Sequence, residues 1–192
     1  MTKHEIWTEL YLYGNISKKV STFALLNCLF QKGMGNYDNF IEPGLKYSIS
    51  RSFYLEGYFR HERYQDEGRW YIENRPQIRL GSQFKLGKWA IRNRQRFEYR
   101  LLPELVKKFR FRTDLRLIPP ESIKLGPFRP FYTGEIFVSK GQLGRTRNYL
   151  GIYMDGERRI VPWIYVLHQG DHKSLGWQST YIIGGLLALT LN

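Results

Sequence analysis

The stretch AIRNRQRFEYRL, residues 90–101, carries four arginines and one glutamate at alternate positions. The intervening positions are mostly apolar or aromatic, with Ile91, Phe97, Tyr99 and Leu101 among them. A repeat of two residues is typical of a β-strand, because successive side chains of a strand point to opposite faces. The stretch therefore predicts a strand with one charged face and one largely apolar face.

The same alternation recurs along almost the whole chain. Eleven segments show it, at 4–14, 19–31, 39–50, 52–64, 69–85, 88–102, 107–118, 128–139, 145–155, 158–168 and 177–191. Long strands with short connections favour an up-and-down meander that closes as a barrel. The sequence thus predicts an all-β fold, with residues 1–192 forming one antiparallel barrel. Because single-chain bacterial barrels have even strand counts, we expect about twelve strands, with ten as the other count, and a miscount within 118–135.

The composition limits the kinds of site that the protein can hold. The chain has 192 residues, a net charge of +13 and a single cysteine, Cys28, so that a disulfide within the chain and a zinc cluster built on cysteines are excluded. We expect no cofactor and no metal. No apolar run reaches 18 residues, and we expect no signal peptide within this sequence. If the protein is exported, we expect that the signal has been removed and that Met1 is an added start.

The position of the charged faces separates two architectures. In a soluble barrel the charged faces would meet water, whereas in a membrane barrel they would line the lumen and the apolar faces would meet lipid. The charged faces hold both signs and many aromatic residues, which favours a packed polar interior. The tryptophans are expected near the strand ends, as an interfacial girdle. Connections near residues 15, 50, 87 and 155 are predicted to be tight turns, and those near 35, 66, 105, 141 and 172 to be longer loops.

Several short motifs appear in a fixed order along the chain. They are the Trp-led first strand (Ile6-Trp7-Thr8), the element Glu73-Asn74-Arg75, the strand with Arg94, Arg96, Glu98 and Arg100, the pair Glu135 and Phe137, and the segment from Asn148. In these motifs the chain resembles the small outer-membrane β-barrels of Gram-negative bacteria known as domain of unknown function 2490. The resemblance implies a transmembrane β-barrel in the bacterial outer membrane, with the lipid bilayer as a partner and no known activity.

The arginine-rich faces are the main candidate site. The residues predicted to face the lumen and anions are Arg75, Arg79, Arg92, Arg94, Arg96, Arg100, Arg110, Arg112 and Arg116, with Glu73, Glu98 and Asp114 as pairing partners. About fifteen Lys or Arg are expected in the lumen against about nine Asp or Glu. Arginine pairs well with carboxylate and phosphate groups, so that a structural or passive pore role with a preference for small anions is the predicted function. A lumen filled by paired side chains is the alternative.

Two further functions remain open from the sequence. A soluble basic barrel would bind nucleic acid or another anionic ligand, although no nucleic acid is expected if the arginines face inward. An outer-membrane lipid hydrolase would use His168, His172 and Ser174, which lie close together in a predicted loop. The histidines and Asp171 are also potential metal ligands, but no fixed scaffold is evident for them. The sequence therefore predicts a protein that is not an enzyme.

Overall fold

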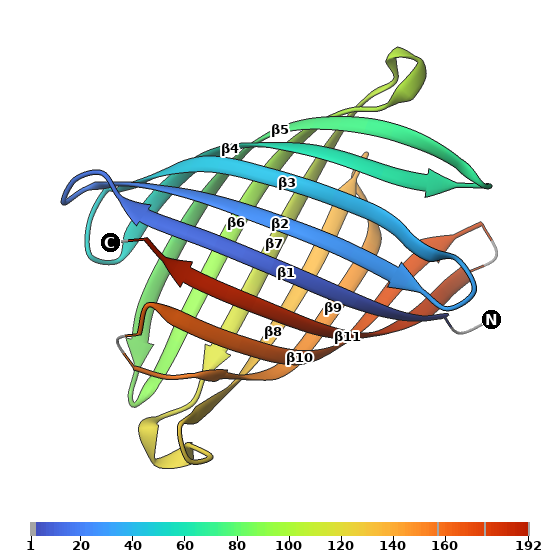
Figure 1. Cartoon of the computed structure of the whole chain (residues 1–192). Helices are drawn as coiled ribbons and strands as arrows, with labels where there is room; N and C mark the ends of the chain where they lie inside the picture. Colours follow the sequence, from blue (N-terminus) through green and yellow to red (C-terminus); the bar gives the residue numbers. More distant parts are fainter. Residues whose placement is uncertain (1–2, 157, 175, 192) are drawn as a thin grey trace.

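The computed structural model describes residues 3–156, 158–174 and 176–191, and these residues form one closed β-barrel of eleven strands (Figure 1). The strands are β1 (Lys3–Asn15), β2 (Val20–Gln31), β3 (Gly35–Ser48), β4 (Phe53–Asp66), β5 (Arg69–Leu86), β6 (Trp89–Leu101), β7 (Lys107–Ile118), β8 (Phe128–Ser139), β9 (Gln142–Met154), β10 (Ile160–Lys173) and β11 (Gly176–Thr190). Two 3₁₀ turns, η1 (Pro103–Leu105) and η2 (Glu121–Ile123), lie in connections between strands. None of the described helical segments is long and apolar enough to cross a bilayer.

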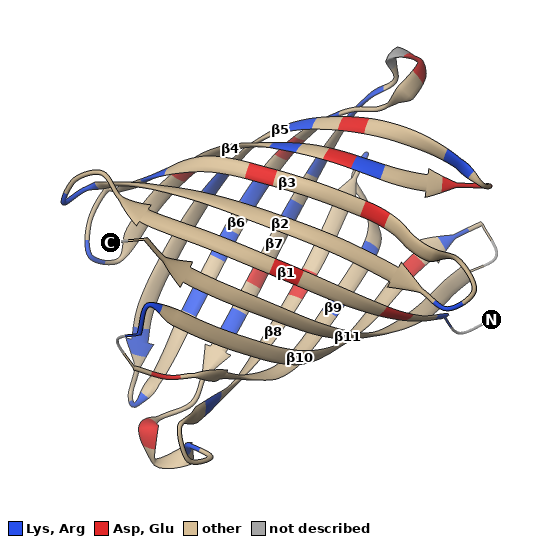
Figure 2. Ribbon diagram, viewed as in Figure 1, with Lys and Arg blue, Asp and Glu red and all other residues tan. Residues whose placement is uncertain are grey.

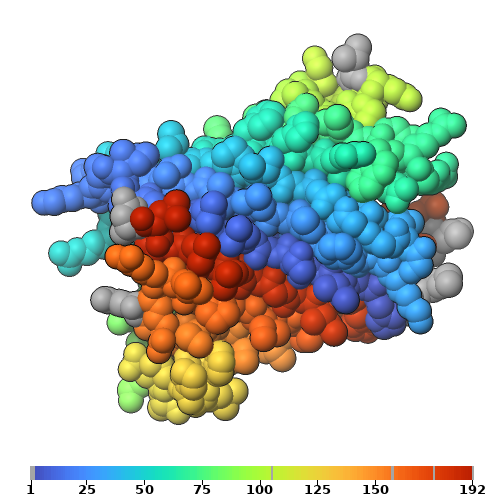
Figure 3. Space-filling model, in the orientation of Figure 1, coloured from blue at the N-terminus to red at the C-terminus, as the bar shows by residue number. Residues whose placement is uncertain are grey.

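The barrel closes through one parallel pair of strands. Each strand pairs antiparallel with the next, whereas β1 and β11 pair in parallel, with Lys3 opposite Thr180 and Tyr13 opposite Thr190. The first and last strands of an odd meander run in the same direction, so that a parallel pair is the only way to close it. The two strands lie side by side in the space-filling view (Figure 3), and the termini lie at opposite ends of the barrel (Figure 1).

The all-β barrel fold predicted from the sequence is confirmed, with two corrections. The barrel has eleven strands, one fewer than the preferred count of about twelve, and it is not antiparallel throughout. The eleven alternating segments were each a real strand, and segment 118–135 holds no additional strand, because 119–127 connects β7 and β8. The expectation of an even count was wrong because parallel pairing removes the need for it.

The two faces of the sheet differ sharply in exposure. Charged side chains point inward, and Glu73, Arg75 and Glu98 are at most 2% exposed. Large apolar side chains point outward on most strands, and Leu150, Ile78 and Ile183 are 57–62% exposed. The apolar faces therefore form the outer wall, and the charged faces line the interior.

The connections do not follow the predicted asymmetry. At the end that holds the N-terminus they are short: 32–34, 67–68, 102–106, 140–141 and 174–175. Both residues of the turns Glu67-Gly68 and Lys140-Gly141 have positive φ, as in type I′ hairpins. The strands therefore continue to the barrel end where longer loops were expected. The longest connection, 119–127, lies at the opposite end, and Glu157 and Leu175 in two other connections lie outside the described residues.

A loop ion pair links two connections at the end opposite the N-terminus. Nζ of Lys124, in the connection 119–127, lies 2.9 Å from Oδ2 of Asp155, in the connection that follows β9. The hydrogen bond with Lys124 holds the pKa of the Asp155 carboxyl below its usual value, and the same contact raises the pKa of Lys124. The pair fixes the longest loop of the barrel to its neighbour.

The tryptophans do not form one girdle. Trp70, Trp89 and Trp177 are exposed near strand ends, as an interfacial position requires. Trp7 is only 6% exposed and Trp163 lines the interior, so the prediction was wrong for these two. Both stand on the inward register of their strands.

Candidate functional site: the charged lumen

The barrel encloses a cavity that side chains do not fill. Its volume is about 780 Å³. Its lining extends along the barrel, from Lys3 and Lys173 near the end with the N-terminus to Arg92 and Ala188 near the other end. The paired side chains of the lumen therefore leave a cavity between them.

All nine predicted arginines line this cavity. They are Arg75, Arg79, Arg92, Arg94, Arg96, Arg100, Arg110, Arg112 and Arg116. Of their three predicted partners, Glu73 also lines the cavity, whereas Glu98 and Asp114 are 1% and 4% exposed and do not line it. The alternation of β5, β6 and β7 thus brings the predicted set together on one inner wall.

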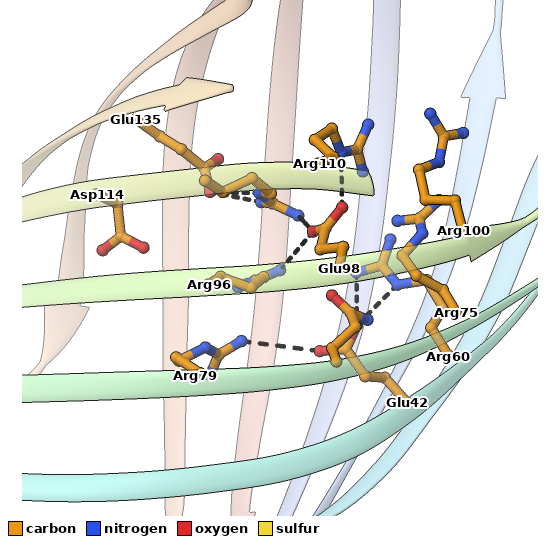
Figure 4. A network of polar contacts seen from close by, with 12 residues as sticks. Glu42, Arg60, Arg75, Arg79, Arg96, Glu98, Arg100, Arg110, Asp114 and Glu135 are labelled. Carbon is orange, nitrogen blue, oxygen red and sulfur yellow. Dashed lines mark hydrogen bonds and ion pairs between the residues drawn. The ribbon is translucent and has the colours of Figure 1, made fainter. Parts of the chain in front are cut away.

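Glu98 is the carboxylate most completely surrounded by arginines. Oε2 of Glu98 accepts a hydrogen bond from Nε of Arg110 at 2.6 Å, and Oε1 accepts one from Nη1 of Arg112 at 3.0 Å. Nη1 of Arg96 lies 3.8 Å from Oε1. Figure 4 shows Arg96 of β6 and Arg110 of β7 pointing toward this carboxylate. Their cross-strand positions follow from the register, in which Glu98 stands opposite Arg110, and Arg96 opposite Arg112.

A second group of ion pairs joins β3, β4, β5 and β6. Glu42, 2% exposed, accepts a hydrogen bond from Nε of Arg60 at 2.7 Å. Glu73 accepts hydrogen bonds from Nε of Arg75 at 2.8 Å and from Nε and Nη2 of Arg100 at 2.7 and 2.6 Å. The pair of Arg100 and Glu73 is bidentate, which is the geometry in which arginine pairs most strongly with carboxylates. These ion pairs hold four neighbouring strands together from the inside.

Several lumen residues were missed by the sequence analysis. Arg112 donates a hydrogen bond to Oε1 of Glu135 from Nε at 2.9 Å, although the two lie on different strands. Nε of Arg147 donates to Gln169 at 2.7 Å, and the hydroxyl of Tyr165 donates to Glu9 at 2.9 Å. The strands that carry these residues show the same alternation, so the faces could be found from the sequence, but their partners depend on strand register.

The lumen keeps a surplus of positive charge. Fifteen Lys or Arg line the cavity, against nine Asp or Glu in its lining and the buried pair Glu98 and Asp114 beneath it, which leaves four positive charges uncompensated. The sequence analysis predicted a surplus of about six, from about fifteen Lys or Arg against about nine Asp or Glu, so the surplus in the structure is smaller by two. The sign of the surplus is as expected.

The charges are separated across the lumen. Eleven of the lining arginines come from β5, β6, β7 and β9, whereas six of the lining carboxylates come from β1, β3 and β4. Figure 2 shows the basic residues along β6 and β7 and acidic residues on β1 and β3, which form the opposite side of the barrel. A solute in the lumen therefore lies between a mainly basic wall and a mainly acidic wall, in a field directed across the barrel axis.

Arg92 and Arg116 both contribute to this surplus. These residues stand directly opposite each other on β6 and β7, and no carboxylate among the described residues lies within 4 Å of either. The guanidinium of Arg116 lies 5.1 Å from the ring centroids of both Phe131 and Trp163, and its Nε donates to Thr133 at 3.0 Å. Like charges opposite each other destabilise a sheet, and an anion between them would relieve that repulsion.

The outward-facing amides of Asn93, Gln95 and Asn148 have hydrogen-bond partners. Nδ2 of Asn93 donates to the backbone carbonyl of Asp114 at 2.9 Å, and Nε2 of Gln95 donates to Asn93 at 2.8 Å. Oδ1 of Asn148 accepts from the hydroxyl of Tyr132 at 2.7 Å. Hydrogen bonding of this kind lowers the cost of placing an amide against hydrocarbon.

The histidine motif does not form a loop. His168 and His172 belong to β10, and Ser174 follows it in a turn. Both histidines stand in the outward register, away from Asp171, which accepts a hydrogen bond from Arg145 inside the barrel. Within the described residues, no group of three His, Cys, Asp or Glu side chains is placed to hold a metal ion.

Comparison with protein families gives one match over most of the chain. The family model described as "Protein of unknown function (DUF2490)" matches residues 4–180. The chain belongs to this family. The resemblance inferred from the short motifs is thereby confirmed.

Comparison with curated proteins gives no significant match. Among solved structures, the chain is similar to the anion-selective porin from Comamonas acidovorans, at 11% sequence identity and a TM-score of 0.43. The alignment covers 88% of this chain and 55% of the porin, so that the chain spans about half the length of that protein.

Proposed function

We propose that the protein is an integral β-barrel of the bacterial outer membrane with a structural or passive pore role, in which anions are preferred over cations. The observation that carries the proposal is the uncompensated pair Arg92 and Arg116, which lines an internal cavity whose other lining charges are also positive in sum. No chemistry in the lumen is required for this role.

The membrane placement rests on the outer wall. Large apolar residues are exposed around the barrel, while charged residues are inside. The shortest strands have 12 residues, which at ~3.3 Å per residue gives a length of ~40 Å. With a tilt of ~45°, such a strand rises ~28 Å, close to the ~30 Å thickness of the hydrocarbon layer. The outer wall therefore matches a bilayer in both length and polarity.

The proposed selectivity is electrostatic. Glu98, Glu73 and Asp114 neutralise the arginines that hold the strands together, so these arginines contribute little to the net potential. Arg92 and Arg116 keep their charge toward the cavity. They lower the energy of an anion that enters the cavity from the end opposite the N-terminus, and they raise the energy of a cation there.

The apolar exterior also bears on the alternative of a soluble nucleic-acid-binding barrel. A nucleic acid needs basic residues on an accessible surface, whereas the basic side chains of β5–β7 described above line the interior. The two functions differ in a simple property: the membrane barrel requires detergent or lipid to stay in solution, and the basic soluble barrel does not.

The test is the reversal potential in planar bilayers under a salt gradient. We expect a potential of the sign that indicates anion preference in the wild-type protein, and a shift toward zero in the double variant Arg92→Gln, Arg116→Gln. Lys18→Gln is the matched control, because Lys18 is exposed in a turn at the same end and lies outside the lumen. Cation preference in the wild type, or no conductance from correctly folded protein, would overturn the pore proposal.

A further inference from the structure

A histidine and a serine meet on the outer wall of the barrel. Nε2 of His168 on β10 lies 3.1 Å from Oγ of Ser179 on β11. The residues are 11 positions apart, and the register places Ser179 opposite Gly170, diagonally from His168 on the same outward face. The sequence analysis grouped His168 with Ser174 instead, because only the register of β10 and β11 brings His168 beside Ser179.

A third polar side chain stands on the other side of the imidazole. Asn148 of β9 is the direct cross-strand partner of His168, and cross-strand partners on one face have Cβ atoms only ~5 Å apart. Its Oδ1 already accepts the hydroxyl hydrogen of Tyr132, and an amide oxygen has a second lone pair. Serine, histidine and asparagine therefore lie in a row across three neighbouring strands.

Two of these three polar residues line an apolar groove on the outer wall. The groove has a volume of about 770 Å³, and His168 and Asn148 lie in its lining with Ile6, Leu150 and Ile183. The three apolar residues are 56–62% exposed. Farther toward the barrel end, the ring of His172 lies 5.4 Å from that of Trp177, an aromatic residue that is 51% exposed. The polar row thus lies between an apolar surface and the barrel end.

We propose that Ser179, His168 and Asn148 form an ester-hydrolysing site on the lipid-facing wall, with acyl esters of membrane lipids as substrates. The geometry is that of a serine nucleophile beside a histidine base, with a third group that orients the base. The apolar groove is suited to hold an acyl chain. The site relies on the membrane placement of the barrel, but not on any permeation through its lumen.

The reaction proceeds in two balanced steps. Oγ of Ser179 attacks the ester carbonyl carbon while its proton passes to Nε2 of His168; the carbon–oxygen bond to the alcohol then breaks, and the alcohol leaves with that proton. Water next attacks the acyl-serine and gives a proton to Nε2, the fatty acid is released, and the proton returns to Ser179. Asn148 is the positioning residue, because it stands directly opposite His168 on the strand that lies on the other side from the serine.

The first experiment measures covalent labelling and needs no known substrate. The full chain in detergent micelles is treated with a fluorophosphonate, which reacts with activated serines, and the modified peptide is identified by mass spectrometry. We expect modification at Ser179, and its loss in His168→Gln. Ser139 is the internal control, because its Oγ donates to the backbone carbonyl of Phe109 and has no such histidine partner. Absence of modification at Ser179 in folded protein would overturn the proposal.

The second experiment measures turnover of a diacyl phospholipid in mixed micelles and of p-nitrophenyl butyrate. We expect Ser179→Ala and His168→Gln each to lower the rate at least ~100-fold, toward that without protein, while Ser139→Ala and Ser174→Ala retain it. Asn148→Ala should lower kcat with little change in KM. It should also shift the pH range over which kcat/KM rises. Equal rates for the wild type and Ser179→Ala would refute the hydrolase, and would leave the result of the conductance test unaffected.

Discussion

Replacing Glu98 by glutamine should destabilise the barrel more than any other single change of charge in the lumen. The carboxylate is 1% exposed and has arginine nitrogens of Arg110, Arg112 and Arg96 at 2.6, 3.0 and 3.8 Å. At an effective dielectric constant of ~20, each such contact is worth ~4–6 kcal/mol before desolvation. Desolvation offsets most of this sum, so that a net loss of ~3–5 kcal/mol in the free energy of unfolding is expected, as for other buried ion pairs that lose one partner.

The measurement is urea unfolding of the barrel in lipid vesicles, followed by tryptophan fluorescence. Glu121→Gln is the matched control, since this side chain is 77% exposed and its contact with Lys124 is 3.7 Å long; the change should stay within ~0.5 kcal/mol of the wild type. The double variant Glu98→Gln, Arg110→Gln should recover part of the loss, because it removes one of the arginines left unpaired. A loss below ~1 kcal/mol for Glu98→Gln would refute the conclusion that the lumen network stabilises the barrel.

Three other changes test packing, the outer wall and a loop. Gly81→Ala should cost ~1–3 kcal/mol of unfolding free energy, because a Cβ there would lie 2.0 Å from the ring of Tyr54, whereas Gly57→Ala meets no atom within 4 Å and should be nearly neutral. Leu150→Arg, on the outer wall, should cost ~2–4 kcal/mol in lipid vesicles if it faces hydrocarbon, and almost nothing in a soluble barrel. The stability difference between the wild type and Asp155→Asn should be constant above about pH 5 and shrink as the pH falls below ~4, because the pKa of Asp155 is lower in the folded protein than in the unfolded chain.

The faces of the strands were predictable because alternation depends only on the residues of one strand. Arg94, Arg96, Glu98 and Arg100 share a face in any β-strand, and all stand on the inward register of β6. Which face is inside could also be inferred, since only a lumen offers so many charges of both signs to one another. The positions of Trp7 and Trp163 were missed because proximity to a strand end was given more weight than their register.

The strand count was harder to predict because it depends on closure, which no local pattern reports. The alternation identified eleven segments, but a general preference for even numbers outweighed it. The prediction of the loop lengths was wrong for a different reason. Polar residues and glycines such as those in 31–39 suggest a loop, yet glycines with positive φ at Gly33 and Gly35 allow a short hairpin with polar residues in the strands themselves.

The contacts between strands could be predicted only where strands are neighbours in the sequence. Glu98 and Arg110 lie on consecutive strands joined by a short connection, so their pairing follows once the faces are known. The pairing of Tyr165 with Glu9 spans 156 positions and depends on the parallel closure of β1 and β11. The same holds for the meeting of the groove residues Ile6 and Ile183, which are direct partners across that pair.

The parallel closure also explains why one barrel can carry two separate candidate sites. Closure brings the apolar outer faces of β1 and β11 together, and this continuous surface extends to β9 and β10, where His168 lies. On the inner side, the same closure places the carboxylates of β1 next to β10 and β11, across the cavity from the arginines of β6 and β7. A shift of β1 against β11 by one residue would invert every side chain of β1 relative to its neighbours. It would expose Glu5 and Glu9 to the outer wall and bury Ile6 in the lumen, so the parallel register sets the polarity of both surfaces.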